Sequence, residues 1–371
     1  MSSRTRNLTR IRPHRPRHRR LKAIASCSPR LALLLIAAQA IIGCDPPTAT
    51  VPGQSGGVMP DRTVRIAYVG FPAGDPEWRM IEKGARHHAS RYSQLILDVL
   101  TPRHKSATEL EATVAAYLPS RPDAVLLSVR DPRVALPAAK RVLESNLRLI
   151  TVGTRIESLK VFGHVDVYLT DAADRLGLAL PELVKPHQSY LLLHDRGRTP
   201  TATRCYQRFD ARAARYFALT RLMEANSFES GRTAFELIPE MVKKFPNAGL
   251  LVTLEPSFWM RASAAQIREL PCRFATLGTH PHLWRYLRSG VAVALAGPIH
   301  PQIGAVAVES AFSSVTAEEP QGFERIIACE LVTAETLDDF AERYAQAAGV
   351  PLSSLLPAPS PASQPAGGGR P

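Results

Sequence analysis

Polar and aromatic side chains follow the first apolar segment of the chain. Residues 64–71 (VRIAYVGF) are an apolar run, and Asp75, Glu77 and Trp78 lie in the segment directly after it. A carboxylate can accept hydrogen bonds from hydroxyls or hold a cation, and an indole offers a flat face on which a ring-shaped ligand can stack. The alternatives are a helix N-cap for Asp75 and packing of Trp78 against the apolar run. The residue types predict binding of a small polar molecule.

This constellation needs a strand before it and a helix after it. The run at 64–71 is rich in β-branched and aromatic residues, which favours a buried strand. From Trp78 to Ala89, apolar residues recur at helical spacing. In open α/β sheets, ligands bind at the carboxyl ends of strands, and the loop with Asp75 lies at such an end.

Strands and helices alternate along most of the chain. Strands are expected at 64–71, 95–100, 124–129, 147–152, 161–167, 189–194, 235–239, 249–254, 274–278 and 291–296. Helices are expected at 78–89, 109–118, 131–144, 170–184, 204–226, 239–245 and 256–270. The alternation predicts an α/β fold with parallel, doubly wound sheets. Residues 62–345 exceed one core and predict two lobes.

The sequence carries no catalytic motif that we recognise. It has no G-x-S-x-G, Walker loop, H-E-x-x-H or C-x-x-C. His280 and His282 flank Pro281 without a third ligand in view, and His87 and His88 lie among charged residues. We expect no enzyme activity, no cofactor and no metal.

Charge is concentrated at the amino terminus. The chain of 371 residues has a formal charge of +13, but ten basic residues and no acid precede Asp45, so removal of residues 1–43 leaves +3. The rest of the chain has a nearly balanced charge, and residues 1–30 hold three prolines and no helix-turn-helix pattern. We therefore expect no nucleic-acid partner.

The basic segment runs into a short apolar one. Leu31 to Gly43 are 13 residues, fewer than the roughly 20 of a spanning helix, which is typical of a secretory signal peptide. Residues 41–44 (IIGC) resemble a bacterial lipobox, so Cys44 is the predicted site of lipidation and 1–44 the signal. An uncut membrane anchor is the alternative. Residues 45–61 read as a flexible tether, and 346–371 as a disordered Pro/Ala/Gly tail.

Three cysteines remain in the expected folded part, Cys205, Cys272 and Cys329. An odd number leaves at least one thiol free. Buried free thiols are favoured over one disulfide bond.

The segment from 64 to 89 resembles sugar-type (type 1) periplasmic substrate-binding proteins of ABC importers, in their lipoprotein form. That family reads Asn-Pro-Phe-Trp and then Glu-Lys-Gly-Ala, where this chain has DPEW at 75–78 and EKGA at 82–85. Later segments follow the family in order over nearly all of 62–340. The segment from His300 resembles the family's penultimate helix, and 330–333 resembles its closing strand. The resemblance implies two Rossmann-like lobes joined by a three-segment hinge. One lobe would hold 62–168 and 298–326, and the other 169–297 and 327–345.

The resemblance also implies a ligand site between the lobes. The residues at the corresponding positions are Asp75, Glu77, Trp78, Asp131, Thr154, Arg155, Arg204, Glu255 and His280. Several differ from the family: an acid is absent beside Thr154 and Arg155, Glu77 replaces an aromatic, and His280 replaces an acid. Because unpaired buried polar groups cost ~1–3 kcal/mol, these replacements predict a different ligand or none.

By the same resemblance the protein is an exported, lipid-anchored, monomeric solute-binding protein on the outer face of the membrane. Its partners would be a small molecule and the permease and ATPase of an importer. A lipoprotein that presents its ligand to a membrane sensor, or a member that has lost sugar binding, fits the same residues.

Overall fold

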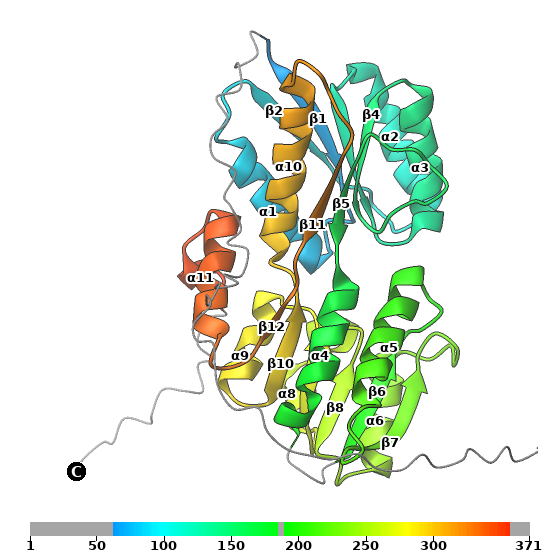
Figure 1. Cartoon of the computed structure of the whole chain (residues 1–371), viewed down its shortest axis with the longest axis vertical. Coiled ribbons are helices and arrows are strands. Elements are labelled where there is room, and N and C mark those ends of the chain that lie inside the picture. Colours follow the sequence, from blue (N-terminus) through cyan, green and yellow to red (C-terminus); the bar gives the residue numbers. More distant parts are fainter. Residues whose placement is uncertain (1–61, 185–188, 357–371) are drawn as a thin grey trace, which may run out of the picture. The chain divides into compact units, whose positions relative to one another are not determined.

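The computed structural model describes residues 62–184 and 189–356; the predicted signal peptide, Cys44 and the tether lie outside this part of the chain, as does the tail beyond 356. Two six-stranded sheets organise it (Figure 1). The first sheet has the order β11-β5-β4-β3-β1-β2, and all its neighbouring strands are parallel. Its strands are β1 (Val64–Val69), β2 (Leu95–Leu100), β3 (Ala124–Val129), β4 (Arg148–Gly153), β5 (Gly163–Val167) and β11 (Phe323–Ile327).

The second sheet has the order β12-β10-β9-β8-β6-β7. Its strands are β6 (Ser189–His194), β7 (Thr220–Asn226), β8 (Leu250–Thr253), β9 (Arg273–Leu277), β10 (Ala292–Gly297) and β12 (Glu330–Val332). Only β12 is antiparallel to its neighbour, β10. We refer to the first sheet with its helices as the amino-terminal lobe and to the second with its helices as the carboxyl-terminal lobe.

Alternating side chains of the first sheet bury both of its faces. In β1, Ile66 and Tyr68 pack toward α1 (Pro76–Ala89) and α10 (His300–Thr316), whereas Ala67 and Val69 pack toward α2 (Ala107–Tyr117) and α3 (Pro132–Glu144). Helices α1 and α10 can approach closely at Gly84 because this residue has no side chain. A Cβ there would lie 1.9 Å from the Pro301 carbonyl oxygen. Two buried faces explain the almost uninterrupted apolar strands.

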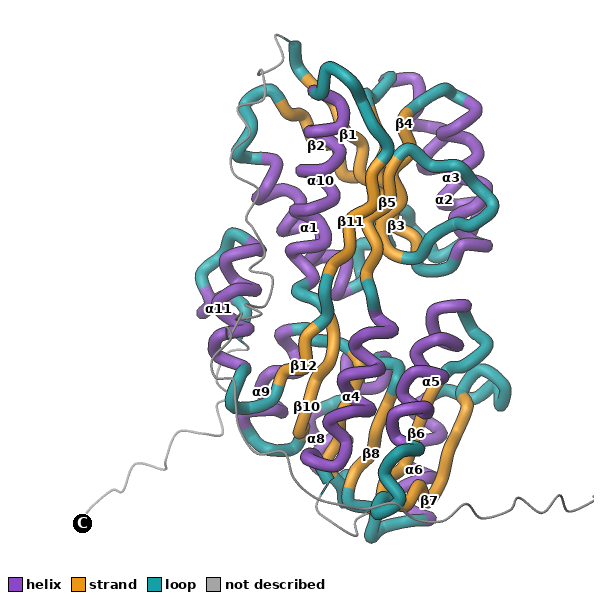
Figure 2. The backbone as a smooth tube through the Cα atoms, viewed as in Figure 1, coloured by secondary structure: helices purple, strands orange, loops and turns teal. Residues whose placement is uncertain are grey.

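The second sheet is covered in the same way. Helices α4 (Leu169–Leu183) and α5 (Pro200–Ala213) cover one face. The other face packs against α6 (Ala234–Lys244), α7 (Ser257–Arg261), α8 (Ala264–Arg268), α9 (Trp284–Arg288) and α11 (Leu337–Ala348). The chain passes between the sheets three times, from β5 to α4, from β10 to α10 and from β11 to β12. Figure 2 shows β5 and β11 side by side before two of these crossovers.

Three predicted elements are wrong. The helix expected over 204–226 is α5, which ends at Ala213, followed by strand β7. β7 is an edge strand with charged residues such as Arg221 and Glu224, so its apolar alternation is weak. The strand expected at 235–239 is part of α6, which begins with a Thr233–Glu236 capping box and contains Pro239. The helix over 256–270 divides into α7 and α8 because Ser263 caps a second helix.

The expected tail begins too early. Helix α11 continues to Ala348, and a 3₁₀ turn (Leu352–Ser354) follows it. Leu355 is buried in the carboxyl-terminal core. Pro351 lies within the segment predicted to be disordered, and it directly precedes the 3₁₀ turn.

Cys205, Cys272 and Cys329 are buried free thiols, as predicted. In residues 62–184 and 189–356, no helix is both long and apolar enough to span a bilayer.

Candidate functional site

Polar side chains gather at the carboxyl edges of the two sheets, and the two edges are in contact. The guanidinium of Arg133, in the first turn of α3, donates to the backbone oxygen of Arg198 across the lobes at 2.7 Å. The hydroxyls of Thr154, after β4, and Thr201, at the start of α5, lie 3.2 Å apart. Parallel strands explain the gathering, because all their carboxyl ends meet at one edge.

Asp75 is buried at this edge and is surrounded by donors. It caps α1 by accepting a hydrogen bond from the Trp78 backbone at 3.0 Å. Its carboxylate also accepts from Arg130 at 2.7 Å and from Lys105 at 3.1 Å. Burial alone would raise its pKa, but the hydrogen bonds and charge of Arg130 outweigh burial and hold the pKa well below its usual range. Asp75 is therefore an ionised N-cap whose oxygens bind protein groups.

Arg130 joins the predicted residues into one network. It bonds Asp75, donates to Glu77 at 2.8 Å, and lies 4.2 Å from the ring centre of Phe71. Glu77 also lies 3.8 Å from the buried imidazole of His300. Arg130 was not among the predicted site residues, although its position directly after β3 is the signal that could have identified it.

Trp78 lies in the core of the amino-terminal lobe. It is 0% exposed and makes edge contacts with Tyr68 and Phe71, with ring centres 5.0 and 6.1 Å away. A Cβ on Gly70 would lie 1.9 Å from the indole, so the ring packs directly over that glycine. Neither face of the indole is open to a ligand in this arrangement, which matches the packing alternative.

Asp131, Thr154 and Arg204 lie at the contact between the lobes. Asp131 caps α3 and holds Arg133 through two hydrogen bonds, at 2.8 and 3.1 Å. Arg204 donates to the Thr201 hydroxyl at 3.4 Å. Thr201 thus connects Thr154 and Arg204, which were predicted from different parts of the chain.

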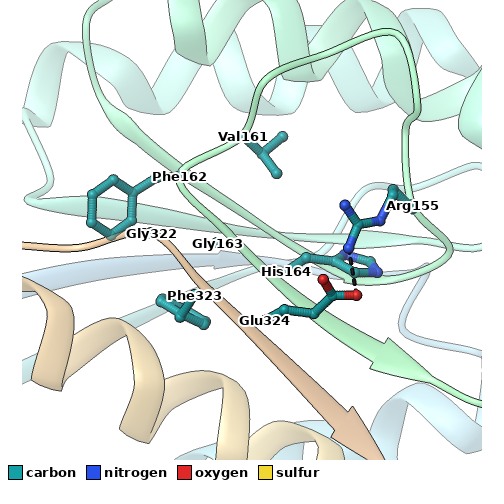
Figure 3. Close-up of a pocket in the computed structure, with 8 residues that line it drawn as sticks. All are labelled: Arg155, Val161, Phe162, Gly163, His164, Gly322, Phe323 and Glu324. Carbon is teal, nitrogen blue, oxygen red and sulfur yellow. Dashed lines mark ion pairs between the residues drawn. The ribbon is translucent and has the colours of Figure 1, made fainter.

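Arg155 lies apart from this group. It pairs with Glu324 on β11 at 2.5 Å and lines a pocket of about 350 Å³ along β5 and β11 (Figure 3). Val161, Phe162, His164 and Phe323 form much of its wall. No other predicted site residue lines this pocket. A second pocket, of about 490 Å³, lies between α6, α7 and α8 and contains none of them.

Two neighbouring carboxylates lie at the carboxyl edge of the second sheet. Asp195 directly follows β6 and pairs with Arg198 at 3.1 Å. Burial, and then the charge of Glu255, raise its pKa to about 6. Glu255 itself accepts from the Ser257 backbone at 3.1 Å. Glu255 was among the predicted site residues, whereas Asp195 was not.

His280 is an uncharged group of the same edge. Burial, and then the charge of His300, lower its pKa to about 3. Its Nδ1 accepts from the His282 backbone at 3.1 Å. Within the described ranges, three or more metal-binding side chains do not come together. The polar and charged side chains of the two edges can form hydrogen bonds and ion pairs to a solute.

No family model matches the chain, and no curated protein is similar to it in sequence. Solved structures share its architecture. An ABC transporter solute-binding protein from Agrobacterium vitis, bound to α-D-tagatopyranose, has a TM-score of 0.65 at 15% identity, over 76% of this chain and 99% of that one. An arabinose-binding protein from Geobacillus stearothermophilus gives 0.64 at 11% identity, over 75% and 99%.

A third structure, a putative LacI transcriptional regulator from Bacteroides fragilis, gives 0.62 at 13% identity, over 75% of this chain and 99% of that one. These likenesses agree with the two sheets and three crossovers described above. The fold predicted from the sequence is confirmed: it is the two-lobed α/β fold of the sugar-type (type 1) periplasmic binding proteins.

Proposed function

We propose that this chain is an extracytoplasmic solute-binding protein that holds a small polar molecule between its lobes. The observation that carries the proposal is the contact between the two carboxyl edges, where Thr154 meets Thr201 and Arg133 meets Arg198. Groups from both lobes can then reach one small molecule. The solved structures with bound tagatose and other sugars support the same class of ligand site.

The same proposal includes the membrane context. The chain would be exported, anchored through Cys44, and would deliver its solute as a monomer to the permease and ATPase of an importer, without catalysis of its own. A ligand-presenting partner of a membrane sensor is the alternative.

A member that has lost neutral-sugar binding is a second candidate. The specific observation in its favour is that Asp75 already binds Arg130 and Lys105 while Trp78 is covered.

Calorimetric titration and thermal shift of the purified full chain test the proposal. Arabinose, allose, tagatose and inositol form the first panel, followed by acidic and phosphorylated polyols. A solute at one hundred times its dissociation constant stabilises the native state by about 2.7 kcal/mol. Thr201→Val should weaken binding, whereas Thr113→Val, on a helix away from the edge, should not. Absence of any binding across the panel would contradict the proposal.

A further inference from the structure

At the contacting edges, the carboxylates of several ion pairs are more buried and their cationic partners are more exposed. The side chain of Asp75 is 5% exposed, whereas its partners Arg130 and Lys105 are 44% and 57% exposed. The same order holds for Asp131 at 22% beneath Arg133 at 70%. In the other lobe, it holds for Asp195 at 16% beneath Arg198 at 56%.

The greater exposure of the cations decides which hydrogen-bonding groups remain for a solute. Asp75 and Asp131 each accept a backbone N–H as well as side-chain donors, so their oxygens are occupied. The accessible groups above them are guanidinium and ammonium N–H donors, which bind carboxylate and phosphate oxygens. A neutral sugar needs acceptors as well as donors, and this part of the edge offers few.

Arg204 is a further cation at the contact between the lobes. Its side chain is exposed, and among the described residues no carboxylate lies within ion-pair distance of it. The hydrogen bond that it makes within the described residues is to Thr201, at 3.4 Å. Thr154 and Arg133 bring the opposite lobe to the same place.

Two carboxylates at the edge are not covered in this way. Among the described residues, Glu255 accepts a backbone N–H through one oxygen and no side-chain donor. Asp166, on β5, is the register partner of Gly153, the residue before Thr154, and burial is the main cause that raises its pKa. Such groups accept hydrogen bonds from hydroxyls. The edges therefore combine a cationic surface with a smaller number of hydroxyl acceptors.

We infer that the solute is a hydroxylated oxyanion, a sugar acid or a sugar phosphate, whose anionic group binds Arg204 and Arg133 while its hydroxyls reach Glu255 and Asp166. This inference rests on the proposed solute-binding function. Carboxylate and phosphate share the chemistry that an arginine pair recognises.

Calorimetric titration of the full chain with related probes tests the inference. The probes are D-glucose, D-gluconate and D-glucose 6-phosphate, the corresponding arabinose series, and inorganic phosphate. One charge-assisted contact corresponds to at least about a tenfold gain in affinity. We expect an acid or phosphate to bind at least about tenfold more tightly than its neutral parent, with weaker binding at higher salt. Gluconate against the phosphate ester distinguishes the two anions.

Arg204→Gln is the decisive variant because it removes a cation without leaving a carboxylate unpaired. It should weaken binding of the anion about 10- to 100-fold. Arg208→Gln, one turn along the same helix and exposed, is the control. Arg133→Gln tests the opposite lobe.

The outcomes separate the two proposals. If a neutral sugar binds as well as its acid, or if neither Arg204→Gln nor Arg133→Gln weakens anion binding, the inference is wrong and the solute-binding function remains. If neither neutral nor anionic probes bind, both are wrong. Tight binding of inorganic phosphate alone would overturn the hydroxylated part of the ligand.

Discussion

Each lobe has a largely buried carboxylate at the carboxyl edge of its sheet, and the pKa values of these two carboxylates are shifted in opposite directions. Asp75, in the loop after β1, is surrounded by Arg130, Lys105 and a backbone N–H, and its pKa is low despite burial. Asp195, after β6, has Glu255 as a neighbour and Arg198 as a partner, and its pKa rises to about 6. Position in the fold is therefore not what sets the character of a carboxylate here. The balance between donors and burial sets it.

The tryptophans of the two lobes show a parallel contrast. Trp259 stacks on Phe274 with ring centres 3.6 Å apart and donates to the Thr253 hydroxyl at 2.7 Å. Trp78 is equally buried, but its indole N–H has no partner in the described part of the chain. The buried indole thus has a hydrogen-bond partner in the carboxyl-terminal lobe and none among the described residues in the amino-terminal lobe.

The largest expected effect is that of Trp78→Ala. Removing a fully buried indole from a core costs about 3–5 kcal/mol of unfolding free energy. Denaturant titration of the protein without solute measures it. A variant as stable as the parent would show that the ring does not pack as the structure places it, and would restore its predicted role as a stacking surface.

Conservative variants sharpen the same contrast. Trp78→Phe keeps the aromatic contact and removes an unpaired N–H, whereas Trp259→Phe removes a buried hydrogen bond and leaves Thr253 with one partner fewer. Such a loss costs about 1–3 kcal/mol. Denaturant titration should therefore find Trp259→Phe less stable than Trp78→Phe, and equal stabilities would contradict the assignment of the unpaired indole.

Arg130→Ala is expected to have the next largest effect. Breaking a buried ion pair typically costs about 3–5 kcal/mol, and because Arg130 is 44% exposed and Lys105 remains, we expect about 2 kcal/mol. Thermal and denaturant unfolding measure the loss. Arg208→Ala, at an exposed position in the other lobe, should change stability by less than about 0.5 kcal/mol, and a similar small change for Arg130→Ala would show that Asp75 does not depend on it.

Asp195→Asn should act in the opposite direction. The folded protein binds the Asp195 proton more tightly than an unfolded chain, whose Asp pKa is about 3.9, so stability falls as the pH rises from about 4 to about 6. Asparagine removes that loss. At pH 7 the variant should be more stable by about 1–2 kcal/mol, since the shift of about two pKa units at 1.36 kcal/mol each is partly offset by the lost Arg198 pair.

Urea titrations between pH 4 and pH 7 measure this difference. The gain should be absent near pH 4, where both proteins are uncharged at this position. A variant that is less stable than the parent at pH 7 would show that the Arg198 pair outweighs burial.

Sequence patterns predicted the central strands and most helices because these strands are buried on both faces and read as continuous apolar runs. The inner strands β3 and β6 were predicted with the bounds that the structure has. The edge strand β2 was too, because its sequence, LILDVL, is mostly apolar. Edge strands that carry more charges were less accessible to this reasoning: β7 was expected to be helical, and β11 was not predicted. Periodicity reports burial, and edge strands have little of it.

The site could be predicted only in outline. Parallel topology places Asp75, Asp131 and Thr154 at one edge, and the sequence identified that edge. It could not show that Arg130 and Lys105 pair with Asp75. Arg130, for example, is 55 residues away in the sequence, and the path of the folded chain brings it to Asp75. The covering of Trp78 likewise depends on Gly70 and Tyr68, whose packing no local spacing reveals.

Glu255→Gln is the smallest expected effect and the most direct test of the comparison between lobes. It removes the charge that acts with burial on Asp195, while the amide keeps the hydrogen bond from the Ser257 backbone. The pKa of Asp195 should move toward its ordinary value without reaching it, because burial is the larger cause. In pH-dependent denaturation, the fall in stability should then begin and end at lower pH than in the parent. An unchanged profile would mean that burial alone separates Asp195 from Asp75, and the crowding of carboxylates would have no part in the difference.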